Sequence, residues 1–345
     1  MNIDEAMRRS RAAVARLLDV CARPGRIVVV MQDNPDPDAL ACAMTIRDLA
    51  QQRLRKRVAI GYAGICGRAE NRAMIETLRI DARRMNPSEL APFRTVCLVD
   101  AQPASGNSDV LGGRRPDVVI DHHLVRRGRP IEAELVDIRP DYGATSTILY
   151  EYAKAADIKI STALATALFY GIQSDTQDLG REFSPSGLQA YQELFLLADK
   201  RKLAHIRRAP VPAAYFCMLA DSLANCLIAG NTVISCIRNC VNADMIPEVA
   251  DLLMRLEGMR RAVCYGLFES DILISARAAD ARGNMAQQMR RVVAHIGSGG
   301  GHRTMAGGHV PGGELPQQRL EQVQERILRV FAPGKTPIPL TSARR

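Results

Sequence analysis

Short, continuous runs of apolar and β-branched residues alternate with helix-like segments through the first third of the chain. Residues 26–31 have the sequence RIVVVM, residues 95–99 have TVCLV, and similar runs occupy residues 58–62 and 117–120. Strands of this kind, when they alternate with helices, indicate a parallel sheet that is covered on both faces. We therefore predict an α/β fold. The predicted helices of this region are residues 3–22, 39–52, 68–78 and 88–91.

The pattern changes after residue 144. Residues 144–202 have mostly helical spacing, and a basic, proline-bearing stretch follows at residues 200–212. Beyond it, runs at residues 232–237, 262–268 and 272–276 predict a second set of strands. We predict one domain over residues 1–200, a linker over 201–220, a smaller α/β domain over 221–332 and a loose tail over 333–345.

Composition narrows the class of protein. The chain has 345 residues and is 47% hydrophobic, enough for a full core. Nine cysteines occur without a C-x-x-C pair, which indicates reduced thiols and neither a disulfide framework nor a zinc knuckle. The net charge of +9 allows an anionic substrate, although a genomic bias toward arginine codons is the favoured explanation. No apolar run is long enough to span a membrane and the start lacks a signal layout, so we expect a cytoplasmic protein without a membrane partner.

Polar side chains follow the predicted strands. Residues 32–38 (QDNPDPD) follow the first strand, and Asp100 follows the third. The triplet Asp121, His122 and His123 follows the fourth, and Asp175 follows a predicted helix at residues 162–172. The carboxyl ends of parallel strands share one edge of a sheet, so we expect these side chains in one crevice.

Clustered carboxylates predict bound cations, because their repulsion would otherwise raise their pKa values. Oxygen ligands with imidazole suit Mn²⁺ or Mg²⁺ better than Zn²⁺. Two carboxylates at i and i+2, with a third on a neighbouring strand, suit two ions about 3.5–4 Å apart. Taken singly, Asp38 or Asp33 could be a helix cap, and His122 and His123 could be structural or surface residues. Their joint occurrence at four segments favours the metal site.

These motifs, in this order, resemble those of the DHH phosphoesterase superfamily. The matching segments are Asn34-Pro35-Asp36-Pro37-Asp38, Asp100, Asp121-His122-His123 and Gly171 to Thr176. The second half resembles the DHH-associated domain, through Ser275-Ala276-Arg277, the loop Gly299-Gly300-Gly301-His302, and Ala306-Gly307-Gly308. The resemblance runs from about residue 20 to 330 and implies an active site in a cleft between the two domains.

The resemblance also implies roles for single residues. Asp36 looks like a ligand of the first metal, Asp38 of the second, and Asp100 like a carboxylate that bridges them. His122 and Asp175 look like further ligands of the second metal. His123 resembles the residue that contacts the scissile phosphate, Asp121 resembles a support for the histidines, and water activated by the metals would attack phosphorus. The residues that resemble substrate-binding positions are Arg277, Gly299, Gly300, Gly301 and His302.

Gln32 departs from the family pattern. Small nanoRNases and nucleotide phosphatases of the superfamily usually have a His at this position as a ligand of the first metal. An amide oxygen binds metal more weakly than imidazole, so either the first site is weakened, or neighbouring Asp33 compensates. A further alternative is a non-catalytic nucleotide-binding sensor.

The expected activity follows from the stand-alone nanoRNase and 3′-phosphoadenosine 5′-phosphate phosphatase branch, which the chain resembles most. We expect hydrolysis, dependent on two divalent cations, most simply Mn²⁺, of oligonucleotides of roughly two to five residues, since the chain lacks the aromatic stacking platforms of long-strand binders. The resemblance further suggests a homodimer.

Overall fold

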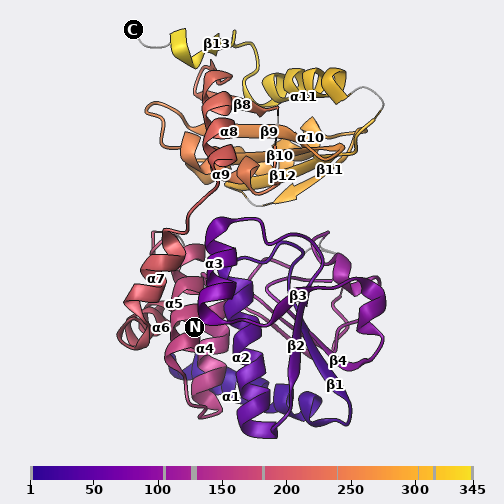
Figure 1. Ribbon diagram of the computed structural model, residues 1–345, viewed down its shortest axis with the longest axis vertical. Coiled ribbons are helices and arrows are strands. Elements are labelled where there is room, and N and C mark those ends of the chain that lie inside the picture. Colours follow the sequence, from indigo (N-terminus) through magenta and orange to yellow (C-terminus); the bar gives the residue numbers. More distant parts are fainter. Residues whose placement is uncertain are drawn as a thin grey trace. The chain divides into compact units, whose positions relative to one another are not determined.

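The computed structural model describes residues 3–103, 106–125, 130–180, 183–238, 240–301, 303–313 and 316–342, without the side chains of residues 281 and 316. Contacts divide the chain into two compact units, Met1–Ala209 and Pro210–Arg345 (Figure 1). No helix among the described residues has the length and apolar character needed to cross a bilayer.

The first unit is built on a six-stranded sheet in the order β3-β2-β1-β4-β5-β6, and every neighbouring pair is parallel. The four predicted strands and the α/β class are confirmed. The two strands that the sequence did not indicate, β3 and β6, are the edges of the sheet, where burial on both faces is not required. The strands are β1 (Arg26–Val30), β2 (Val58–Tyr62), β3 (Ala82–Arg84), β4 (Phe93–Val99), β5 (Val118–Asp121) and β6 (Leu135–Ile138).

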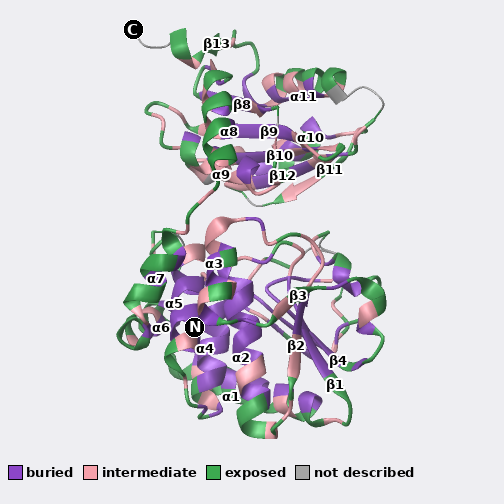
Figure 2. Ribbon diagram, in the orientation of Figure 1, coloured by how far each residue is buried: buried purple, intermediate pink, exposed green. Residues whose placement is uncertain are grey.

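Both faces of this sheet are covered, as predicted. Alternate residues of β1 enter different cores: Ile27 and Val29 pack with the helices, and Val28 and Val30 pack in a smaller cluster with the short helices η1 and η2. Helices α2 and α5 are buried along most of their length (Figure 2). The helices are α1 (Ile3–Ala22), α2 (Pro37–Leu54), α3 (Ala69–Leu78), η1 (Pro87–Leu90), η2 (Asp109–Leu111), α4 (Thr145–Ala155), α5 (Thr162–Asp175), α6 (Pro185–Leu197) and α7 (Lys200–Arg207).

Residues 201–220, which we predicted as a linker, contain the boundary between the two units and are largely helical. Asp199 caps α7 by accepting hydrogen bonds from the backbone N–H groups of Arg201 and Lys202, at 3.0 and 3.1 Å. Leu203 and Ile206 are buried on the inner face of this helix. The basic residues are therefore the solvated face of an amphipathic helix, and only residues 208–212 separate α7 from α8 (Ala213–Ala224).

The second unit contains a mixed sheet in the order β11-β12-β10-β9-β8-β7-β13. Only β8 and β9 pair in parallel, and the other neighbours are antiparallel. The strands are β7 (Leu227–Ala229), β8 (Thr232–Ile237), β9 (Arg261–Phe268), β10 (Asp271–Ala278), β11 (Ser298–Gly301), β12 (Met305–Val310) and β13 (Ile338–Pro339). The helices after α8 are α9 (Met245–Leu253), η3 (Ala281–Gly283), α10 (Met285–Val292), α11 (Pro316–Phe331) and η4 (Leu340–Ser342).

The glycine segment predicted as a loop is a strand as far as Gly301. Gly299 of β11 pairs with Gly308 of β12, and Met289 of α10 lies over both. A Cβ at Gly299 would lie 3.0 Å from Met289 Cγ, and one at Gly308 would lie 2.7 Å from its Sδ. The glycines therefore allow α10 to pack closely on the sheet.

The tail also differs from the prediction of a loose segment. β13 pairs with β7, and the Leu340 N–H donates to the Cys226 carbonyl at 2.8 Å. Without this pairing, the short strand β7 would be the edge of the sheet, and residues 338–340 bind the backbone groups that would then be unpaired.

Candidate metal centre

The predicted site residues lie where the strand order reverses. β1 is first in the chain and pairs with β2 on one side and β4 on the other. In open parallel sheets, the crevice at such a reversal is where ligands bind. Gln32 and Asp36 follow β1, and Asp100 follows β4 directly.

Asp38 lies in the first turn of α2, fully buried. Asp36 caps this helix by accepting from the Ala39 N–H at 3.0 Å, and Pro37 opens it, which is a common start for a helix. The Asp38 carboxylate accepts hydrogen bonds from the backbone N–H groups of Thr145 and Ser146, both at 2.7 Å. These groups belong to the first turn of α4, whose N-cap residue has no side-chain cap of its own. Asp38 is thus held by the N-terminus of another helix.

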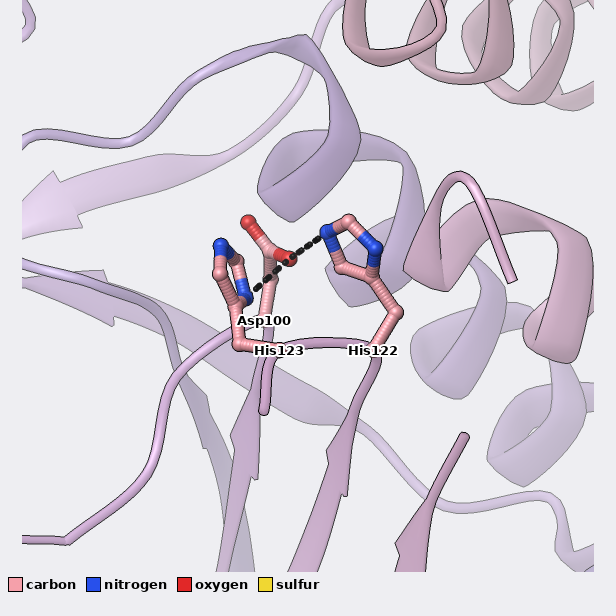
Figure 3. Close-up of side chains that lie close together, drawn as sticks. All are labelled: Asp100, His122 and His123. Atoms are coloured by element: carbon pink, nitrogen blue, oxygen red, sulfur yellow. Dashed lines mark ion pairs between the residues drawn. The ribbon is translucent and has the colours of Figure 1, made fainter. Parts of the chain in front are cut away.

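Asp100 has a positive φ of 55° and is 1% exposed. This left-handed conformation is uncommon outside glycine and asparagine, and it turns the chain sharply at the end of β4. The carboxylate accepts from Thr145 Oγ1 at 2.9 Å and from Gln32 Nε2 at 3.3 Å. Its Oδ1 lies 3.8 Å from His122 Nε2 and 3.9 Å from His123 Nδ1, so it faces both rings (Figure 3).

The His122 ring is oriented by a backbone carbonyl. Its Nδ1 is 3.0 Å from the Tyr142 carbonyl oxygen, which can only accept, so Nδ1 carries a proton. In the neutral ring Nε2 then has a lone pair, and it lies 3.1 Å from Asp175 Oδ2 and 3.8 Å from Asp100 Oδ1. This buried Nε2 has no well-formed hydrogen bond within the described residues. A lone pair aimed at carboxylates requires a proton or a metal ion between them, so these residues fit a cation.

His123 and Asp121 form a second, linked pair. His123 Nδ1 lies 2.8 Å from Asp121 Oδ1, which also accepts from the His122 backbone N–H at 2.9 Å. The other oxygen of Asp121 accepts from Gln102 Nε2 at 2.8 Å, and Gln102 also donates to the His123 carbonyl at 3.0 Å. Gln102 was not predicted from the sequence, where its one signal is its place two residues after Asp100.

Ligand atoms of Asp38, Asp100, His122 and Asp175 all lie within 4.8 Å of one another. These are the residues that the family resemblance implies around the second metal. A second group, within the same distance, is Asp100, His122 and His123. Asp36 belongs to neither of these two groups of described residues.

Burial and like charge raise the pKa values of Asp36, Asp38 and Asp100. Burial, with the charges of Asp175 and Asp38, raises the pKa of Asp36 to about 7. Burial and the charges of Asp36 and Asp38 raise the pKa of Asp100 well above its usual range. Burial lowers the pKa of His122, but the adjacent Asp175 carboxylate outweighs this and raises it to about 10. A bound cation would replace these protons and relieve the repulsion.

The predicted substrate residues lie in the second unit. Arg277 of β10 is 12% exposed, and its Nε donates to Asp251 Oδ1 at 2.6 Å and its Nη1 to Ser275 Oγ at 2.8 Å. Gly299, Gly300 and Gly301 lie in β11, where Gly301 has a φ of +135°. His302 lies outside the described residues.

Two known domain families match the chain. Residues 26–172 match the DHH family, N-terminal domain, and residues 229–332 match the DHHA1 domain. The chain has the phosphoesterase-type fold of this class. It belongs to the DHH family, so the resemblance inferred from its motifs is confirmed.

A curated relative from Methanocaldococcus jannaschii, an uncharacterized protein, is 33% identical over 310 residues. The matched stretch is 88% of this chain and 62% of the relative, so the chain spans less than two thirds of the relative's length.

Two solved structures show the same fold. An exopolyphosphatase-related protein of Bacteroides fragilis has a TM-score of 0.67 and 15% identity, and the match covers 92% of this chain and 96% of that one. RecJ of Thermus thermophilus, in complex with Mn²⁺, has a TM-score of 0.51 and 14% identity, over 94% of this chain and 55% of that one.

Proposed function

We propose that the chain is a manganese-dependent phosphodiesterase and phosphatase of very short oligonucleotides, with linear dinucleotides and 3′-phosphoadenosine 5′-phosphate as the substrates to test. The observation that carries the proposal is the buried His122 Nε2, which lies without a well-formed hydrogen bond in the described structure and faces the carboxylates of Asp100 and Asp175. A RecJ structure of similar fold is in complex with Mn²⁺, which supports a divalent cation as the cofactor.

Asp38, Asp100, His122 and Asp175 would hold one cation, and Asp36 with Gln32 would contribute to a second. The bound cations would polarise the phosphoryl group and activate water. The chain's own part is to fix the ligands and exclude water: Asp38 and Asp100 are nearly fully buried, and both accept hydrogen bonds from Thr145.

His123 would stabilise the charge that develops on the phosphate. Burial lowers the pKa of His123, but the hydrogen bond to Asp121 outweighs this and raises it above its ordinary value. A ring that holds a proton on both nitrogens can donate to Asp121 through Nδ1 and to a phosphoryl oxygen through Nε2.

Arg277 and the glycines of β11 would bind the remaining phosphate or terminal nucleotide of the substrate. A guanidinium presents a planar fork that matches phosphate oxygens. Glycine has no Cβ, so its backbone N–H group can approach these oxygens closely. The small aromatic content of 4% supports short substrates, because long strands are held by stacking on aromatic side chains.

The test is hydrolysis of a labelled dinucleotide by the purified protein with Mn²⁺. We expect turnover by the wild type and a loss of about 100-fold or more in Asp100→Ala, because the carboxylate shared by both ligand groups is removed. Asp109→Ala, which removes an exposed carboxylate outside both groups, is the matched control and should retain activity. Absence of wild-type turnover, or equal activity of Asp100→Ala and the wild type, would reject the proposal.

A nucleotide sensor is the second candidate, because of Gln32. Its Nε2 donates to Asp100 Oδ2, so its amide satisfies a carboxylate in the site where the family usually has imidazole. Calorimetry that shows tight dinucleotide binding without Mn²⁺ uptake would favour the sensor. The homodimer and the cytoplasmic location stay predictions, to be checked by light scattering and cell fractionation.

A further inference from the structure

We infer that Tyr142 is a positioning residue of the metal centre. Its phenol anchors residues 142–146, the segment before and into α4 that we name the ligand-holding segment. The inference rests on the proposed metal site and concerns residues that are not ligands themselves.

The ligand-holding segment contacts three of the four clustered ligands. Each contact is a hydrogen bond of 3.0 Å or less to a side chain that would bind the cation. They are Tyr142 O with His122 Nδ1 at 3.0 Å, Thr145 N to Asp38 Oδ2 at 2.7 Å, Ser146 N to Asp38 Oδ1 at 2.7 Å, and Thr145 Oγ1 to Asp100 Oδ1 at 2.9 Å. A displacement of this segment would therefore move several ligands together.

A buried ionic cluster contacts the ligand-holding segment at Tyr142. The side chain of Arg139 is 1% exposed and donates to Asp137 at 2.7 Å, to Glu151 at 2.7 Å and to Ser10 of α1 at 2.9 Å. Buried ion pairs add little net stability, because desolvation offsets their attraction, but their directional bonds favour one geometry. Such a cluster is suited to fixing the position of the backbone around Arg139 and Tyr142.

Tyr142 connects the cluster to the ligands. Its OH donates to Glu151 Oε1 at 2.9 Å and lies 3.2 Å from Arg139 Nη1, while its carbonyl holds His122. The backbone completes the connection: the Tyr142 N–H donates to the Arg139 carbonyl at 3.0 Å, and the Arg139 N–H donates to the Asp121 carbonyl at 2.9 Å. The phenol and the carbonyl of one residue thus join the ionic cluster to the imidazole.

Tyr152 provides a matched control. It is fully buried, and its OH donates to Asp137 Oδ2 of the same cluster at 2.7 Å. Within the described part of the chain it makes no hydrogen bond to a proposed ligand. Tyr142→Phe and Tyr152→Phe therefore remove the same group from the same cluster, and only the first loosens a residue that holds His122.

The experiment is calorimetric titration of both variants and the wild type with Mn²⁺, together with melting temperatures in the absence and presence of Mn²⁺. We expect both variants to lower the metal-free melting temperature. Tyr142→Phe should weaken Mn²⁺ binding about tenfold, and Tyr152→Phe should stay within about twofold of the wild type, because only indirect support of a ligand is lost in the first.

A second pair of variants keeps the test informative if Tyr142→Phe does not fold. Thr145→Val removes the hydroxyl that donates to Asp100 and should weaken Mn²⁺ binding. Thr145→Ser keeps a hydroxyl and should bind Mn²⁺ as the wild type does. Equal Mn²⁺ affinity of Tyr142→Phe and Tyr152→Phe would overturn the inference and leave the metal site standing. If Tyr142→Phe does not fold, equal Mn²⁺ affinity of Thr145→Val and Thr145→Ser would overturn the role of the ligand-holding segment on which the inference depends. A wild type that takes up no Mn²⁺ would overturn both.

Discussion

Substitution of Gly171 by Ala tests how tightly the core is coupled to the metal centre. Gly171 lies in α5, where that helix crosses α2 and the start of α4. A Cβ at this position would lie 2.4 Å from Ser146 Oγ and 3.2 Å from both the Cα and Oδ1 of Asp38. The first distance is about 1 Å shorter than an ordinary contact, so Ser146 must turn away or the helices must separate.

Two opposing effects set the magnitude. Ala in place of Gly within a helix is worth about 1 kcal/mol in propensity, and overpacking of a tight core costs about 1–3 kcal/mol. We therefore expect Gly171→Ala to lower the free energy of unfolding by about 0–2 kcal/mol. Mn²⁺ affinity should fall as well, because the Asp38 carboxylate must shift.

The double variant Gly171→Ala/Ser146→Ala separates the clash from other causes. Ser146→Ala removes the oxygen that meets the new methyl group, so the double variant should be more stable than the sum of the single changes by at least about 0.5 kcal/mol. Urea unfolding without metal, and calorimetry with Mn²⁺, measure the two effects. A Gly171→Ala protein more stable than the wild type with unchanged Mn²⁺ affinity, or additive single effects, would refute the reasoning.

Three further predictions concern protons, the first metal and the substrate. The raised pKa values of Asp36, from 3.8 to about 7, and of His122, from 6.5 to about 10, mean that the folded, metal-free protein binds protons that the unfolded chain has released. The free energy of unfolding of the metal-free protein should therefore fall as pH rises through these two ranges, and Mn²⁺ binding should release protons and become tighter at higher pH. Calorimetry in two buffers of different ionisation enthalpy measures the number of protons released. If no protons are released, Asp36 and His122 are not metal ligands with raised pKa values. Gln32→His should raise Mn²⁺ affinity, measured by the same titration, and an unchanged affinity would argue against Gln32 as a metal-facing position. Arg277→Ala should raise the KM for a dinucleotide about tenfold without changing Mn²⁺ affinity. Asp251→Asn leaves the guanidinium in place and should not raise this KM. Equal KM values for the two variants would count against Arg277 as a phosphate ligand.

Three of the strands that the sequence predicted, β1, β4 and β5, are buried on both faces along most of their length. β1, β4 and β5 are continuous apolar runs for that reason, and their boundaries fall within two residues of the prediction. The missed strands have other constraints. β6 is an edge strand with alternating burial, and β11 is a run of glycines whose pairing depends on α10 packing over it.

The candidate ligands could be predicted because each follows a strand or belongs to a distinctive motif. The groups that hold these ligands in place could not be predicted. The Tyr142 carbonyl and the Thr145 and Ser146 amides are backbone groups, which every residue carries, so no residue type reveals them. They reach the ligands only because the N-terminus of α4 packs against the start of α2, a contact between segments more than 100 residues apart.

Asp38 shows why the structural and the functional interpretation of a carboxylate need not compete. From the sequence, Asp38 could be a cap of its own helix, but Asp36 takes that role, and Asp38 instead accepts hydrogen bonds from the first N–H groups of α4. Those two bonds and the positive end of the helix stabilise a buried negative charge, in part offsetting the burial and the Asp175 charge that raise the pKa of Asp38. A carboxylate has lone pairs to spare after two such bonds, so the oxygens that cap α4 can also face a cation. The packing of α4 on α2 and the assembly of the metal centre are therefore one arrangement, and a change that separates the two helices should weaken metal binding even where every ligand is intact.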